Sequence, residues 1–182
     1  FKADGVFGSD DHLFAKAVFF YDDVKDFIAP KGWFEPTTPP TVYYSSQNVG
    51  HVVRKGIELS GTYAAGQFST SVSYGLLHAV DKETNERMNG ITPQSANLKL
   101  AYAFPAQAIN VWYRAHWSKG GESSVEDRAT GKNLHFSSFL THSLGAEWSP
   151  KVADLANLQA GIAVVNLFDK EYRMLNGSYG SG

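Results

Sequence analysis

Cysteine is absent from the sequence, which excludes disulfide scaffolds and thiolate metal sites but assigns no cellular compartment. An excess of basic charge is also missing, since 16 Lys and Arg face 18 Asp and Glu. Proteins that bind nucleic acid usually carry a basic stripe, so we expect no nucleic-acid partner. No segment approaches the run of about 20 apolar residues that a transmembrane helix needs. Residues 1–11 lack a basic region followed by an apolar stretch, so no signal peptide is predicted.

Aromatic residues (14%) and glycine are plentiful, and the apolar residues recur with a period of two, which is the pattern of β-strands. Five segments show this alternation most clearly: residues 57–63, 68–77, 97–104, 109–117 and 140–148. In each, one face carries Leu, Ile, Val or aromatic residues, and the other carries Ser, Thr, Asn, Gly or charged residues. No helical periodicity competes with this pattern. The sequence therefore predicts an all-β chain of about eight strands.

The connections between these strands alternate between two lengths. Short turns are expected at residues 9–11, 65–66 and 105–107 and after Pro150, and long connections at 29–40, 81–90 and 119–133 and after Tyr172. This alternation places every long connection at the same end of the sheet. Outer-membrane β-barrels have this arrangement, with short periplasmic turns and longer extracellular loops. The mixed charge and the glycines of residues 119–133 further predict a flexible loop.

The two faces of the predicted strands also fit a barrel in a membrane. The apolar face carries aromatic residues near the strand ends, namely Tyr63, Phe104, Tyr113, Trp117 and Trp148. A lipid-facing band bounded by aromatic girdles has this composition, and the polar face suits a wet interior. Only a closed barrel satisfies every backbone polar group in lipid, so the sheet must continue around a circle. We predict an antiparallel transmembrane β-barrel; the alternative is a soluble β-sandwich, whose apolar faces would meet in a core.

Three segments carry a resemblance to a known family. They are VVNLFDKEYR (164–173), followed by a Gly-rich tail, FFYDDVKDFIAP (19–30) and QNVGHVVRKGIELSGTY (47–63). In order and spacing they resemble the C-terminal strands of TonB-dependent outer-membrane receptors. The resemblance implies that residues 1–182 are the C-terminal portion of a large plugged barrel of the 22-stranded type. It also implies a fragment, because the plug domain, the TonB box and the final strand are absent from this chain.

The same resemblance implies a transport function and no enzymatic one. It suggests a receptor in the outer membrane of a Gram-negative bacterium, surrounded by lipid and lipopolysaccharide. The receptor would take up an iron chelate, haem or a ferric siderophore, as transported ligand rather than bound cofactor. Energy would come from the TonB complex through the plug. The alternatives are uptake of cobalamin or copper, a passive porin or adhesin barrel without a plug, and a lipid-face hydrolase that uses His142.

Candidate site residues fall into two sets. In the long connections and at strand ends, aromatic and histidine side chains could contact a ligand: Trp33, Phe34, Tyr43, Tyr44, His78 and His135. On the polar face, charged side chains could line the lumen and dock the plug: Glu58, Lys99, Arg114, His116 and Glu147. Lys99 and Arg114 are similarly distant from the turn at Pro105, so we expect them to lie opposite each other. Like charges across a ladder repel, which predicts that a carboxylate or a residue of the plug lies between them.

Four further residues have structural interpretations. Asn166 and Asp169 are expected to bond local backbone where a strand ends, and Gly56 to permit a bulge or a close backbone approach. His142 falls on the apolar face between leucines, which a register shift, a second subunit or a lipid headgroup could explain. The histidine spacing predicts no resident metal site.

Overall fold

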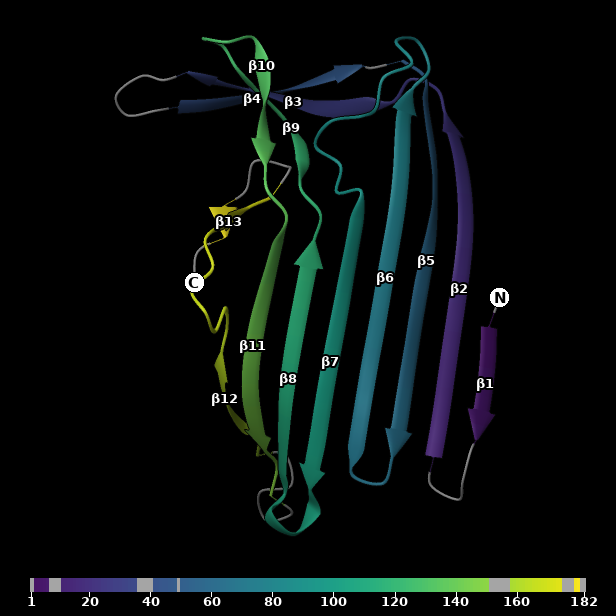
Figure 1. The fold of residues 1–182 in the computed structure, drawn as a ribbon, viewed down its shortest axis with the longest axis vertical. Helices are drawn as coiled ribbons and strands as arrows, with labels where there is room; N and C mark the ends of the chain where they lie inside the picture. The colour runs from purple at the N-terminus through teal and green to yellow at the C-terminus, as the bar shows by residue number, and fades with distance from the viewer. Residues whose placement is uncertain are drawn as a thin grey trace.

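A computed structural model describes residues 2–6, 11–35, 41–48, 50–150, 158–174 and 179–180. Its main feature is an eight-stranded sheet with the order β1-β2-β5-β6-β7-β8-β11-β12, in which all neighbours are antiparallel (Figure 1). The strands of this main sheet are β1 (Lys2–Val6), β2 (Asp11–Val24), β5 (Val52–Ala65), β6 (Phe68–Asp81), β7 (Gln94–Phe104), β8 (Ile109–Ser118), β11 (Phe139–Trp148) and β12 (Ala160–Val164). Within the described residues β1 and β12 do not pair with each other, so the main sheet is an open strip.

Among the described connections, the short and long ones lie at opposite ends of the main sheet, as predicted (Figure 1); residues 7–10 and 151–157, where two further short turns were predicted, lie outside the described ranges. At the short end, Gly66 turns the chain with a φ of +55°, and a Cβ atom there would meet nothing within 4 Å. The next turn at that end is a single 3-10 turn, η1 (Pro105–Gln107), closed by Ala108 in the left-handed conformation. At the other end the chain leaves β2, β6 and β8 through the long connections. None of the described residues forms a helix long and apolar enough to cross a membrane.

The register of the main sheet assigns each residue to a face, because residues directly opposite each other share one. Leu100 pairs with Tyr113, and Tyr113 with Leu144, on the apolar face. The predicted alternation is therefore confirmed. The apolar face is not covered by any other described element: Leu59, Val72, Tyr102, Leu144 and Ile162 are each more than 40% exposed. A soluble sandwich would bury these side chains, so the described part of the chain does not have that fold.

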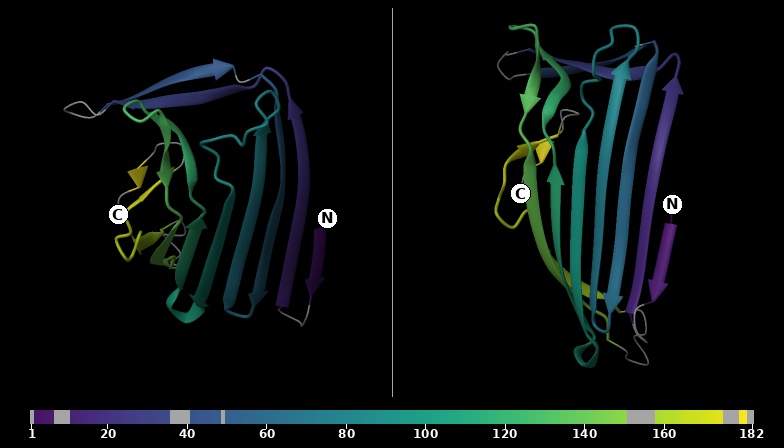
Figure 2. Two further views of the ribbon diagram at one scale, coloured as in Figure 1. Left: turned by 45° about the horizontal axis from the view of Figure 1, so that its top comes forward. Right: turned by 45° about the vertical axis from the view of Figure 1, so that its right-hand side comes forward.

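Four further strands form a second sheet across the long-connection end of the main sheet (Figures 1 and 2). They are β3 (Ile28–Glu35), β4 (Thr41–Asn48), β9 (Gly121–Asp127) and β10 (Lys132–Phe136), in the order β10-β9-β3-β4. We call this the upper sheet. Two antiparallel hairpins build it, and β3 and β9 join them in parallel. A small pair, β13 (Tyr172–Arg173) and β14 (Tyr179–Gly180), follows β12.

The upper sheet corrects the prediction of irregular long loops at 29–40 and 119–133. Each connection contains a hairpin, and backbone groups that one hairpin leaves unpaired are satisfied by the other. Pairing between distant segments overrides the glycine, proline and charge that favoured a loop. The β9–β10 turn is ordered by Asp127, whose carboxylate accepts hydrogen bonds from the Ala129 amide at 2.9 Å and the Thr130 hydroxyl at 3.1 Å. Residues 36–40 lie outside the described ranges.

Candidate functional site

The four aromatic residues predicted to contact a ligand all belong to β3 and β4 of the upper sheet. Trp33 and Tyr43 are directly opposite and stack with ring centroids 5.6 Å apart. The Arg128 guanidinium lies 4.9 Å from the centre of the Trp33 ring, so a cation caps the aromatic pair. Tyr43 and Tyr44 are 44% and 53% exposed. Phe34 belongs to β3 through its backbone pairing with Val42.

Gly32 allows the Tyr44 ring to lie flat on the upper sheet. A Cβ atom at Gly32 would stand 2.9 Å from the Tyr44 ring and 3.1 Å from Val125. These distances are shorter than normal carbon contacts, so only glycine fits without displacing the ring. Val125 and Ser123 of the neighbouring strand β9 are fully buried. The aromatic surface is therefore supported by packing and is not a loose loop.

The two histidines of the predicted ligand set are separated. His135 is in β10, where its Nδ1 donates to Oε1 of Glu122 on β9 at 2.9 Å. It thus belongs to the upper sheet with the aromatic residues. His78 is in β6, opposite Lys55 and on the same face as Leu76, so it lies apart from that group. Contact of any of these residues with a ligand stays a prediction.

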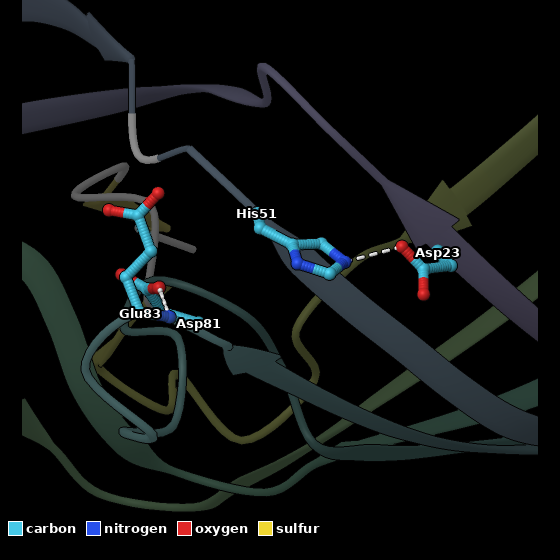
Figure 3. Close-up of polar contacts among 4 residues, drawn as sticks. All are labelled: Asp23, His51, Asp81 and Glu83. Carbon is cyan, nitrogen blue, oxygen red and sulfur yellow. Dashed lines mark hydrogen bonds and ion pairs between the residues drawn. The ribbon is translucent and has the colours of Figure 1, made fainter.

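A pair that the sequence pattern did not reveal lies where β2 and β5 reach the long-connection end. His51 Nε2 hydrogen-bonds Oδ1 of Asp23 at 2.5 Å. Figure 3 shows this pair, with Asp81 and Glu83 on the other side of His51 and linked by a 2.8 Å bond from the Glu83 amide. The described residues contain no group of three or more His, Asp or Glu side chains placed to hold a metal ion. The pairing of His51 with Asp23 could be recognised only from the register between β2 and β5.

The polar face of the main sheet carries the second predicted set. Lys99 and Arg114 are directly opposite, which confirms the expected pairing. The Arg114 guanidinium lies over the Trp112 ring at 5.4 Å, and the Trp112 indole Nε1 donates to Oε1 of Glu147 at 3.2 Å. Glu58 lies on the same face, opposite Gly75. No ion pair among the described residues joins Lys99 or Arg114 to a carboxylate.

A row of hydrogen bonds runs across three strands just above the two cations. The Asn97 amide Nδ2 donates to Oγ of Ser73 at 3.1 Å. Its Oδ1 is therefore turned toward His116 and lies 2.7 Å from Nδ1 of that ring. These polar-face residues are thus linked by hydrogen bonds, from Trp112 to Glu147 and from Asn97 to Ser73 and His116. Sequence periodicity placed His116 on this face but could not identify Asn97 as its partner.

The histidine on the apolar face has a partner within the chain. The Tyr113 hydroxyl shares a 2.5 Å hydrogen bond with Nδ1 of His142, and the edge of Phe168 covers the imidazole at 5.0 Å. The register is regular at this position, with His142 opposite Ala115. No shift, second subunit or headgroup is needed to explain this residue.

Asn166 lies just after the end of β12 and bonds local backbone as predicted. Its side chain bonds both backbone groups of Lys170 at 3.0 Å, the oxygen accepting from the amide and the nitrogen donating to the carbonyl. Asn166 and Asp169 both have positive φ, at 54° and 47°, and the Asp169 amide donates to the Asn166 carbonyl. Gly56 also meets its prediction: a Cβ there would lie 2.3 Å from the Leu76 carbonyl oxygen.

A family description, TonB dependent receptor-like β-barrel, matches residues 3–167. The chain belongs to this family. The match extends from β1 to β12 and thus covers the main sheet and the upper sheet together. TonB-dependent receptors are outer-membrane transporters of Gram-negative bacteria and not enzymes. The family therefore does not support the alternative of a hydrolase that uses His142.

Relatives of this TonB-dependent receptor chain are longer than the chain itself. Heme/hemopexin utilization protein C of Haemophilus influenzae strain 86-028NP is 24% identical over 173 residues, which cover 93% of this chain and 24% of the relative. Among solved structures, the copper transporter OprC has a TM-score of 0.66 at 19% identity, over 97% of this chain and 26% of that one. The FrpB iron transporter from Neisseria meningitidis (F5-1 variant) has a TM-score of 0.65 at 17% identity, over 96% and 28%. These structural matches establish the fold, and the chain spans about a quarter of the curated relative's length.

Proposed function

We propose that residues 1–182 form the C-terminal part of the barrel of an outer-membrane receptor in a Gram-negative bacterium. The complete receptor imports an iron chelate into the periplasm, with energy from the TonB complex transmitted through a plug domain. Haem is favoured over a ferric siderophore. The observation that carries this preference is the name of the curated relatives, haem/hemopexin utilization proteins, which match over 93% of this chain.

The two candidate surfaces receive different roles in this proposal. The upper sheet contributes to ligand capture from the medium, because Trp33, Tyr43 and Tyr44 offer aromatic area beside a guanidinium and His135 lies in the same sheet. Aromatic surfaces with a few polar groups are typical of small-molecule sites. The polar face lines the lumen, where Glu58 and Glu147 contact the plug. The apolar face contacts lipid and lipopolysaccharide acyl chains.

Growth under iron limitation tests this function. A strain that lacks the gene is supplied with haem or with single ferric siderophores as the sole iron source. We expect loss of growth on haem, restoration by the intact gene, and no restoration when tonB is also deleted. Unimpaired growth on haem together with loss of growth on one siderophore would reassign the ligand. Growth that does not depend on tonB would contradict active transport and favour a passive barrel.

A further inference from the structure

His116 is held in one tautomer with its second nitrogen available. The Asn97 amide nitrogen donates a hydrogen bond to Ser73, so the Asn97 amide oxygen faces the imidazole. An amide oxygen only accepts, and the hydrogen must therefore be on Nδ1 of His116. A neutral imidazole that donates through Nδ1 presents a lone pair at Nε2. Histidines that bind metals are oriented in this way, by a hydrogen bond from the other ring nitrogen to a carbonyl or carboxylate. No hydrogen bond to Nε2 is found among the residues that the structure describes.

One base alone does not hold a bare metal ion, and no further donor joins it within the described part of the chain. The described ranges contain no cluster of three His, Asp or Glu that could complete a coordination sphere. Any metal bound at Nε2 must therefore already carry most of its ligands and keep an axial position open. A ferric siderophore that fills all six positions does not meet this requirement, whereas an iron tetrapyrrole does, because haem iron is commonly held by an axial histidine.

The surroundings of His116 match the two ends of such a molecule. Lys99 and Arg114 lie on the same face, two residues from Asn97 and His116 toward the short-turn end, which is about 7 Å at the usual rise of a β-strand. They face each other, and no ion pair among the described residues neutralises either charge, so an anion that bound between them would relieve their repulsion. The guanidinium is steadied by the Trp112 ring, which leaves its donors available for a carboxylate.

On the opposite side of His116 the wall becomes aromatic. The Phe139 ring lies 5.7 Å from the His116 ring, and Tyr172 stacks on Phe139 at 4.2 Å. Phe139 is only 7% exposed, so the pair is fixed in place. Cations, a base and an aromatic pair thus follow one another along the polar face, toward the long-connection end.

We propose that this stretch of the lumen wall is a binding site for an iron tetrapyrrole. His116 Nε2 is the axial ligand of the iron, Lys99 and Arg114 pair with the carboxylates, and the stacked Phe139–Tyr172 pair borders the apolar edge of the ring. Asn97 is a positioning residue that keeps Nε2 unprotonated. The inference rests on the proposed function, and it assigns the ligand class and one protein donor on the path through the barrel.

The test uses the full-length receptor in detergent and two probes, ferric protoporphyrin IX and metal-free protoporphyrin IX. Both probes have the same plane and the same carboxylates, but only the first has an axial position. We expect His116→Ala to weaken binding of the ferric probe about 10- to 100-fold, to change its Soret spectrum, and to leave the metal-free probe unaffected. Lys99→Gln and Arg114→Gln should weaken both probes equally. Asn97→Leu should weaken the ferric probe and alter its spectrum without affecting the metal-free one.

His12→Ala is the matched control, because His12 lies on the polar face of the main sheet, as His116 does, but in β2 and near the short-turn end. It should change neither affinity nor spectrum. Equal losses for both probes in His116→Ala would overturn axial ligation, and so would an unchanged Soret spectrum. If the wild-type receptor supports growth on haem but His116→Ala binds both probes normally, the proposed function stands and this site is wrong. If the wild-type receptor binds neither probe, the tetrapyrrole assignment itself fails.

Discussion

Replacing Gly56 with alanine should destabilise the barrel, although alanine is the smallest possible addition. A Cβ at this position would lie 2.3 Å from the Leu76 carbonyl oxygen and 2.5 Å from Cζ of Phe20. Phe20 can rotate, but the carbonyl belongs to the ladder between β5 and β6. To reach even 3.0 Å the two strands must separate by roughly 0.7 Å, which stretches hydrogen bonds of about 2.9 Å toward 3.6 Å and effectively breaks them.

The cost can be estimated from this displacement. Two neighbouring ladder bonds at about 1 kcal/mol each give a loss of about 2 kcal/mol, within the range of about 1–3 kcal/mol for overpacked sites. Gly61 in the same strand is the control, since a Cβ there would meet its nearest neighbours at 3.4 and 3.6 Å, which is ordinary contact. Gly61→Ala should be neutral or stabilising by about 0.5–1 kcal/mol, because it reduces the entropy of the unfolded chain.

Urea unfolding of the full-length receptor in lipid vesicles, followed by tryptophan fluorescence, measures both variants. A lower midpoint for Gly56→Ala at unchanged slope indicates a loss of stability. The two variants should differ by at least about 2 kcal/mol, which corresponds to roughly a 30-fold change in the folding equilibrium. Coincident midpoints for the two glycine variants would refute the idea that close strand approach dictates glycine at position 56.

Three other substitutions have defined outcomes. Asn166→Ala removes both side-chain bonds to Lys170 and places alanine at positive φ. We expect the free energy of unfolding to fall by about 1–3 kcal/mol and proteolysis after Val164 to become faster. An unchanged digestion pattern would contradict this. Tyr113→Phe leaves the His142 imidazole without its hydrogen-bond partner on the apolar face and should lower the free energy of unfolding by about 1–3 kcal/mol. Adding His142→Leu should restore the urea midpoint. A double variant whose midpoint stays low would argue against the Tyr113–His142 pair. Lys31→Ala breaks only an exposed 4.0 Å ion pair and should shift the midpoint by less than about 0.5 kcal/mol, so a larger shift would reveal an additional role for Lys31.

The faces of the strands could be predicted because they depend on local alternation alone. Lys99 and Arg114 were expected opposite each other from their equal distances to one turn, and the register bears this out. The same kind of local signal identified Asn166, whose side chain bonds backbone only four positions away. In each case the interacting groups belong to one strand, one hairpin or one turn.

Contacts between separate hairpins could not be predicted. The partner of His142 is on β8, and the hydrogen bond depends on the register between β8 and β11. The upper sheet depends on a pairing between β3 and β9, which no single window of sequence contains. Charge, proline and glycine favoured loops at both segments, and tertiary pairing decided otherwise. For the candidate ligand residues, proximity in the upper sheet follows from the fold, whereas ligand contact does not.

The parallel pairing of β3 with β9 also has a consequence for the order of folding. Gly32 and Val125 are partners although more than ninety positions of sequence separate them. Such a contact carries a large loop-closure cost unless the intervening strands are already aligned. We therefore expect the upper sheet to assemble last, after the hairpins of the main sheet have found their register. During biogenesis, a barrel in which the segment around Trp33 is still unpaired would then be one that has not finished folding.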